Sequence, residues 1–88
     1  MEVTFLDKFN KDLDKVKDKT VMKSLQLLIH KAELSNNLHD LPNVKKLEGY
    51  KSAFRIRIGD YRIGIFVKGN TIEFARMVHR KDIYKVFP

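Results

Sequence analysis

The sequence has no cysteine and no long apolar run. The absence of cysteine excludes disulfide bonds and cysteine-ligated metal centres, which suits a reducing cytosol. No apolar stretch approaches the roughly 18 residues that a membrane-spanning helix needs. The first residues, Met1–Phe5, lack the basic and apolar regions of a secretory signal peptide. We therefore expect a cytoplasmic protein with no membrane partner.

Most common catalytic constellations are also missing. The three histidines, His30, His39 and His79, do not have the spacing of metal ligands. The chain contains no phosphate-binding glycine loop and no serine-nucleophile elbow. No pair of carboxylates shares the polar face of the sheet predicted below, where Glu73 stands alone. We expect neither a metal ion nor a cofactor.

Length and charge point to one small basic domain. The chain has 88 residues, so we expect a single domain, residues 1–88, with one modest core. The net charge is +7. Residues 1–40 carry seven lysines and seven acids, whereas residues 41–88 carry eleven basic residues and four acids. A basic face of this kind attracts polyanions, although an ordinary solvated surface is the alternative.

The N-terminal half predicts a short strand followed by two helices. Glu2–Phe5 has an extended pattern and leads into apolar residues at helical spacing. A second apolar stripe runs from Val21 to Ala32, with Asp18 or Thr20 as its N-cap. The charged residues of the first helix, Asp12 among them, alternate in sign and predict a solvated surface.

The C-terminal half predicts a three-strand antiparallel meander and a short tail. The strands are about Ala53–Ile58, Tyr61–Lys68 and Thr71–His79. Two-residue turns of the primed type, Gly59–Asp60 and Gly69–Asn70, join them and set their register. The result is an α+β domain in which two helices cover one face of a meander.

Carrying this register along the chain defines a core face and a polar face. Arg57 falls opposite Arg62, and directly opposed like charges destabilise a sheet, so we expect an anion beside them. Gly64 and Ala75 share a row with Arg55 and should leave a hollow for a ligand. The predicted core face holds Phe54, Ile56, Ile58, Tyr61, Ile63, Ile65, Val67, Ile72, Phe74, Arg76 and Val78. The predicted polar face holds Arg55, Arg57, Arg62, Gly64, Phe66, Glu73, Ala75, Met77 and His79.

The polar face has the chemistry of single-stranded nucleic acid recognition. Guanidinium groups bind phosphate in a bidentate way, and Phe66 and Met77 offer apolar surface for a base. His79, predicted across from Asp60 on this face, is suited to proton transfer near neutral pH. Tyr84 can fold back over the same face to stack, to donate a proton or simply to pack.

Three segments together resemble the RelE/ParE superfamily of bacterial and archaeal toxins: Leu47–Gly49, Phe54–Arg62 and His79–Tyr84. The resemblance extends along essentially the whole chain. It implies a small RelE-like fold with an N-terminal strand, a two-helix hairpin packed on one face of an antiparallel β-meander, and a short C-terminal tail. It also implies a toxin of a type II toxin–antitoxin system.

RelE-like members cleave mRNA, typically on the ribosome, without a metal, by attack of the 2′-hydroxyl on the adjacent phosphate. The well-known RelE pattern has lysines at the positions of Arg55 and Arg57. Arginine is a poor general base, so His79 is our candidate for proton abstraction, with Tyr84 or Glu48 behind it. The catalytic candidates are Arg57, Arg62, His79, Arg80 and Tyr84. The substrate-binding candidates are Arg55, Lys51 and Phe66.

The resemblance implies two partners, a cognate antitoxin and mRNA on the ribosome. A ParE-like toxin that inhibits DNA gyrase without cutting RNA is the first alternative, because the fold and the Gly59–Arg62 segment are common to both groups. The segment His79–Tyr84 favours the nuclease. The second alternative is a basic interaction module that binds an acidic protein without catalysis.

Overall fold

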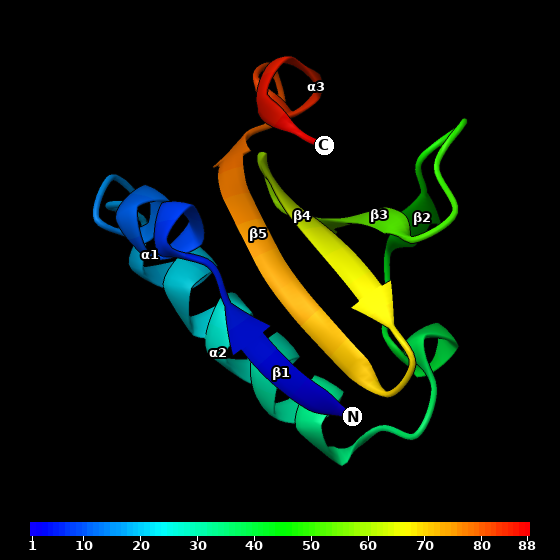
Figure 1. Ribbon diagram of the computed structural model, residues 1–88. Helices are drawn as coiled ribbons and strands as arrows, with labels where there is room; N and C mark the ends of the chain where they lie inside the picture. Colours follow the sequence, from blue (N-terminus) through cyan, green and yellow to red (C-terminus); the bar gives the residue numbers. More distant parts are fainter.

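The computed structural model describes all 88 residues and shows a five-stranded mixed sheet with helices on both faces (Figure 1). The order of elements is β1 (Glu2–Phe5), α1 (Asp7–Leu13), α2 (Lys19–Leu34), the short 3-10 helix η1 (Leu38–Asp40), β2 (Val44–Lys46), β3 (Ala53–Ile58), β4 (Tyr61–Lys68), β5 (Thr71–His79) and α3 (Ile83–Val86). The predicted strand, helix pair, meander and tail are all present. None of the helices has the length and apolar character that crossing a membrane would require.

The strands follow the order β1-β5-β4-β3-β2. β3, β4 and β5 form the predicted antiparallel meander. β1 lies parallel to β5 along Thr71–Phe74, and β2 lies antiparallel to β3. The sequence pattern placed neither edge strand, because the pairing of β1 joins segments far apart in the chain and β2 has only three residues.

The main core lies between α2 and the face of the sheet that α2 covers. The Asp18 carboxylate accepts hydrogen bonds from the backbone N–H groups of Thr20 and Val21, at 2.9 and 3.2 Å. Of the two predicted candidates, Asp18 is therefore the N-cap of α2. The buried face of α2 packs against the aliphatic side chains of the meander. The core residues are Phe9, Val16, Val21, Leu25, Leu28, Ala32, Leu38, Leu41, Ile56, Ile63, Ile65, Ile72, Phe74 and Met77.

A β-bulge in β5 reverses the predicted faces at its end. Ile65 pairs with Phe74 while Gly64 pairs with Arg76, so Ala75 is an extra residue on β5. Beyond it the alternation is shifted by one residue. Met77 therefore enters the main core and Val78 pairs with Arg62 on the opposite face. The prediction was wrong for both of these side chains.

The bulge also moves His79 away from the arginine face. His79 pairs with Tyr61 on the face of the sheet that α1 and α2 cover, which we call the helix side. The two rings meet edge to face, with centroids 6.1 Å apart. The predicted position of His79, across from Asp60 and on the arginine face, is wrong. Strict alternation cannot reveal an inserted residue, and this accounts for the error.

Asp12 and Arg76 form a partly buried ion pair at the edge of the sheet. Arg76 donates from Nε and Nη2 to the Asp12 carboxylate at 2.8 and 3.1 Å. The backbone N–H of Met77 donates to the same carboxylate at 2.9 Å. The side-chain hydrogen bond from Arg76 to Asp12 raises the pKa of Arg76 from its ordinary value. The expectation of a solvated Asp12 was wrong, since the residue is only 6% exposed and takes the place of the strand partner that β1 no longer supplies.

The C-terminal tail covers part of the other sheet face with a second small core. This core contains Leu47, Ala53, Ala75, Ile83 and Phe87, with Phe66 and Val78 packed against it. A Cβ at Gly64 would lie 2.5 Å from the ring of Phe87. The hollow predicted at Gly64 is therefore filled by the chain itself. Figure 1 shows α3 on the opposite side of the sheet from α1 and α2.

Candidate functional site

The β3–β4 hairpin places two arginines directly opposite each other. The observed register pairs Ile58 with Tyr61 and Arg57 with Arg62, as the sequence predicted. Gly59 has a φ of +55°, a conformation that glycine adopts without strain and that a primed turn requires. The short turn fixes the register, so the guanidinium groups share one row of the sheet.

Arg62 is held in place by the turn that precedes it. Its Nη1 donates to the backbone oxygens of Gly59 and Tyr61, each at 3.0 Å. Nε and Nη2 remain free, and they form the edge with which arginine grips phosphate in a bidentate way. Burial lowers the pKa of Arg62 from its ordinary value, and the charges of Arg55, Arg57 and Arg80 lower it further.

A shallow hollow of about 270 Å³ collects the positive charge of this face. Its lining consists of Asn43, Val44, Lys45, Arg55, Arg57 and Arg62. Four of these six residues are cationic and none is acidic. Lys45 comes from β2 and pairs across the sheet with Arg55. Lys45 was not among the predicted site residues, because the order Val44-Lys45-Lys46-Leu47 lacks the strict alternation that marks a strand.

The arginines of this site have no carboxylate partners. The ion pairs of the structure are Arg76–Asp12 and Lys85–Asp82, and neither includes Arg55, Arg57, Arg62 or Arg80. An antiparallel sheet that brings like charges together without counter-charges is destabilised unless an anion binds there. The arrangement can therefore hold a phosphate or another anion.

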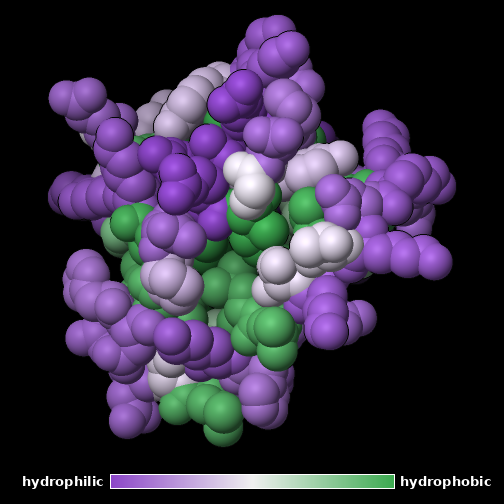
Figure 2. All heavy atoms as spheres, turned by 180° about the vertical axis from the view of Figure 1, so that it is seen from behind, coloured by the Kyte–Doolittle hydropathy of each residue, from purple (hydrophilic) through white to green (hydrophobic).

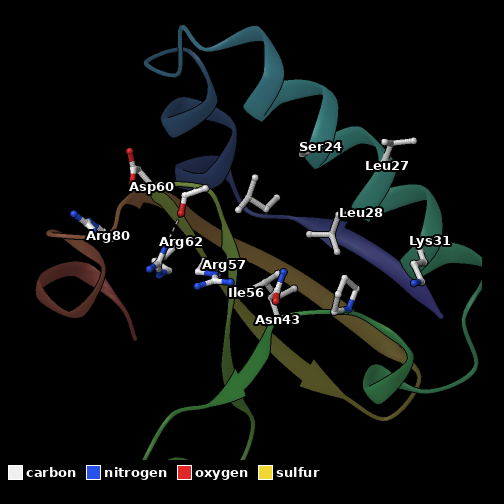
Figure 3. A pocket seen from close by; sticks show the side chains of 13 residues that line it. Ser24, Leu27, Leu28, Lys31, Asn43, Ile56, Arg57, Asp60, Arg62 and Arg80 are labelled. Atoms are coloured by element: carbon white, nitrogen blue, oxygen red, sulfur yellow. Dashed lines mark hydrogen bonds between the residues drawn. The ribbon is translucent and has the colours of Figure 1, made fainter.

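A larger cleft of about 680 Å³ adjoins the arginines (Figure 3). Arg57, Arg62 and Arg80 lie along one wall, and α2 supplies the other wall with Leu27 and Leu28. Figure 2 shows hydrophobic atoms in a hollow on this side of the molecule, framed by hydrophilic side chains. The cleft thus offers apolar surface next to fixed positive charge.

The tail brings Arg80 and Tyr84 to the site. The backbone N–H of Arg80 donates to Asp60 O at 2.8 Å, which ties the start of the tail to the hairpin turn. The Nε of Arg55 donates to the Tyr84 hydroxyl at 3.0 Å. Tyr84 is 64% exposed, so its ring is open to a ligand and is not merely a packing residue. Tyr84 thus folds back over the arginine face, which the sequence had left open as one possibility.

Three other predicted site residues lie apart from the arginines. The Nδ1 of His79 accepts a hydrogen bond from the backbone N–H of Lys81 at 3.2 Å, on the helix side of the sheet. Phe66 packs against Phe87, with ring centroids 5.0 Å apart, so the tail covers much of the surface predicted for stacking. Lys51 lies in the exposed β2–β3 loop, in a separate hollow that also contains Glu48. The structure shows no group of three acidic or histidine side chains that could hold a metal ion.

Fold and site together define a small α+β domain with an uncovered arginine cluster and a tail packed on the same sheet face. A family model described as "ParE toxin of type II toxin-antitoxin system, parDE" matches residues 3–84. Toxin RelE3 of Methanocaldococcus jannaschii is 47% identical over 89 residues, and the match covers all of both chains.

Solved structures of toxin–antitoxin complexes contain chains that are similar to this one. A chain of the RelB-RelE antitoxin-toxin complex from Methanococcus jannaschii is 44% identical, with a TM-score of 0.84 over 97% of this chain and 99% of that chain. A chain of the archaeal RelE-RelB complex from Pyrococcus horikoshii OT3 has the same fold, with a TM-score of 0.71 at 22% identity over 93% and 97% of the two chains. The chain belongs to the ParE toxin family of type II toxin–antitoxin systems, within the RelE/ParE superfamily, and the predicted RelE-like fold is confirmed.

Proposed function

We propose that this toxin is a metal-independent endoribonuclease that cleaves mRNA on the ribosome and thereby arrests translation and growth. The observation that carries the proposal is the cluster of Arg55, Arg57, Arg62 and Arg80, none of which has a carboxylate partner, beside the exposed hydroxyl of Tyr84. The 47% identity to a protein named Toxin RelE3 supports it. Its place of action is the cytoplasm.

The proposed reaction needs charge stabilisation more than a nucleophile from the protein. The ribose 2′-oxygen forms a bond to the adjacent phosphorus, the bond from phosphorus to the 5′-oxygen breaks, and a 2′,3′-cyclic phosphate results. Arg57, Arg62 and Arg80 stabilise the negative charge of the pentacovalent intermediate. The turn contacts of Arg62 hold one such group in place before substrate arrives. Arg55 and Lys45 bind a flanking phosphate.

Tyr84 is the group on this face that can move a proton. Its oxygen accepts from Arg55 Nε, so its own proton is free to pass to the departing 5′-oxygen. The proton of the 2′-hydroxyl passes to water, because the arginines keep their charge and cannot take it. His79 lies on the opposite face of the sheet from the arginines, so it does not take the proton of the 2′-hydroxyl in this mechanism.

The cognate antitoxin is the proposed protein partner. The solved relative at 44% identity comes from an antitoxin–toxin complex, which supports a similar partner for this chain. The lining of the hollow around Arg55, Arg57 and Arg62 contains no acidic residue, so an antitoxin that covers this hollow would present acidic groups. Binding of an acidic protein alone does not separate this toxin from a plain interaction module.

A ParE-like toxin that inhibits DNA gyrase is the second candidate, because the matching family model carries the ParE name. Expression of the wild type and of Arg62→Ala, followed by primer-extension mapping of mRNA, separates the two. We expect new transcript ends with the wild type and none with the variant. Intact transcripts together with inhibited DNA supercoiling would instead establish that the protein is a gyrase inhibitor.

A further inference from the structure

The ring of Phe87 sits directly on the backbone of Gly64. The three atoms nearest to a Cβ built at Gly64 all belong to this ring, at 2.5, 2.6 and 2.6 Å. Ordinary van der Waals contact begins at 3.4 Å, so an alanine at this position would push the ring away by about 1 Å. Phe87 is 4% exposed, and Gly64 is buried beneath it. Only glycine leaves room for this contact.

The contact between Phe87 and Gly64 anchors the short helix α3. The backbone N–H of Phe87 donates to Ile83 O at 2.8 Å, and Ile83 is fully buried. A helix of four residues is not stable by itself, because the conformational entropy lost in fixing the first turn exceeds the stabilisation from its hydrogen bonds. Ile83 and Phe87 therefore hold α3 on the sheet from its two ends, and Tyr84 lies between them.

Gly64 is the cross-strand neighbour of Arg55, and this pairing links the contact between Phe87 and Gly64 to the arginine cluster. The two residues pair directly across β3 and β4, and such pairs have Cα atoms about 4.5–5.5 Å apart. The tail thus contacts one row of the sheet twice. Phe87 rests on Gly64, and the Tyr84 hydroxyl accepts from Arg55 Nε. A shift at the first contact must alter the second.

We propose that Gly64 and Phe87 are a positioning pair that sets the Tyr84 hydroxyl at Arg55. Neither residue touches the reacting atoms, and the catalytic consequence rests on the proposed nuclease function. A displacement of about 1 Å in a catalytic group is enough to reduce a rate by about 10²-fold. The pair makes the tail an integral part of the site.

The first test is spectroscopic and needs no RNA. The ¹⁵Nε resonance of Arg55 reports its hydrogen bond to Tyr84, and Tyr84→Phe supplies the reference position for the broken bond. We expect Gly64→Ala and Phe87→Ala to move the resonance towards that reference, and Phe87→Leu to restore it in part. Val86→Ala, in the same tail but 38% exposed and not seated on Gly64, is the matched control and should leave it in place.

The second test separates positioning from loss of the fold. Thermal melting should show that the variants remain folded, because Phe87 packs outside the main core. In RNA cleavage we expect kcat to fall about 10²-fold for Gly64→Ala while KM stays near the wild-type value, since the arginines are untouched. In the double variant Gly64→Ala/Phe87→Ala the ring that clashes is gone. Its kcat should therefore match that of Phe87→Ala alone.

The proposal is overturned if Gly64→Ala leaves the Arg55 resonance unchanged, or if Val86→Ala moves it equally. An additive double variant would also contradict it. If the wild type cleaves no RNA, the nuclease assignment fails, and the resonance alone then decides whether Gly64 and Phe87 position Tyr84.

Discussion

Arg57 and Arg62 face each other across neighbouring antiparallel strands, and no carboxylate contacts either guanidinium. Like charges in this position destabilise a sheet by a few tenths of a kcal/mol up to about 1 kcal/mol. The sheet keeps the pair even though the same fold joins Arg76 to Asp12 a short distance away. The pair is therefore better explained by the phosphate that we propose it binds than by a contribution to stability.

Replacing Arg57 with glutamine should stabilise the free protein. The change removes the repulsion at an exposed position, so the free energy of unfolding in urea should rise by about 0.2–1 kcal/mol. Lys68→Gln is the matched control, because Lys68 is also exposed on a strand but pairs with Thr71. A loss of stability in Arg57→Gln alone would mean that Arg57 makes a stabilising contact.

The same variant should weaken RNA binding in a salt-dependent way. Each phosphate contact to single-stranded nucleic acid contributes about 0.7 to the slope of log K against log salt. We expect Arg57→Gln to reduce the slope by roughly that amount with a short RNA, measured by fluorescence anisotropy at several salt concentrations. An unchanged slope would exclude a phosphate contact at Arg57.

Arg62 should matter through its geometry as well as its charge. Arg62→Lys keeps the charge but loses the fork and the fixed contacts to Gly59 and Tyr61. We expect both Arg62→Lys and Arg62→Ala to lower kcat by roughly 10²–10³-fold, with unfolding transitions close to the wild type. Full activity in Arg62→Lys would show that charge alone suffices.

Tyr84 and His79 should differ sharply in their effects. Tyr84→Phe keeps the ring and removes the proton donor, so kcat should fall by roughly 10²–10⁴-fold while RNA affinity is retained. His79→Gln should leave kcat nearly unchanged, because His79 lies on the helix side of the sheet. Single-turnover cleavage of a short RNA measures both. The opposite pattern would return proton transfer to His79.

Asp12→Ala should be the most destabilising of these changes. It leaves the guanidinium of Arg76 and the backbone N–H of Met77 without their shared acceptor. Charged hydrogen bonds of this kind contribute about 1.5–3 kcal/mol, and we expect a loss of about that size in urea unfolding. Asp14→Ala, at an exposed carboxylate two residues away, should change stability little. Equal losses in the two variants would show that the effect belongs to α1 in general.

The hairpin could be predicted because its information is local. Alternating residues and a two-residue turn fix a register without reference to the rest of the chain, so the opposition of Arg57 and Arg62 was confirmed. The bulge at Ala75 was missed, and with it the positions of Met77, Val78 and His79. One signal was present, since the unbroken register put Arg76 on an apolar face.

The contents of the site depend on contacts that sequence spacing does not encode. Phe87 fills the space at Gly64, and Lys45 joins the arginines through an edge strand of three residues. Phe87 lies far along the chain from Gly64, and the strand that carries Lys45 is too short for its pattern to be recognised. A glycine in a strand indicates a close approach, but it does not say whether a ligand or the chain itself makes it.

The carboxylate of Asp12 has a consequence for solubility. Where β1 ends, β5 would present an unpaired N–H at Met77, and an exposed edge of this kind invites pairing with a strand from another molecule. Asp12 occupies that donor and brings the bulky side chain of Arg76 beside it. The ion pair thus leaves no free donor at Met77 for a strand of another molecule, at the part of the edge that the short first strand does not reach.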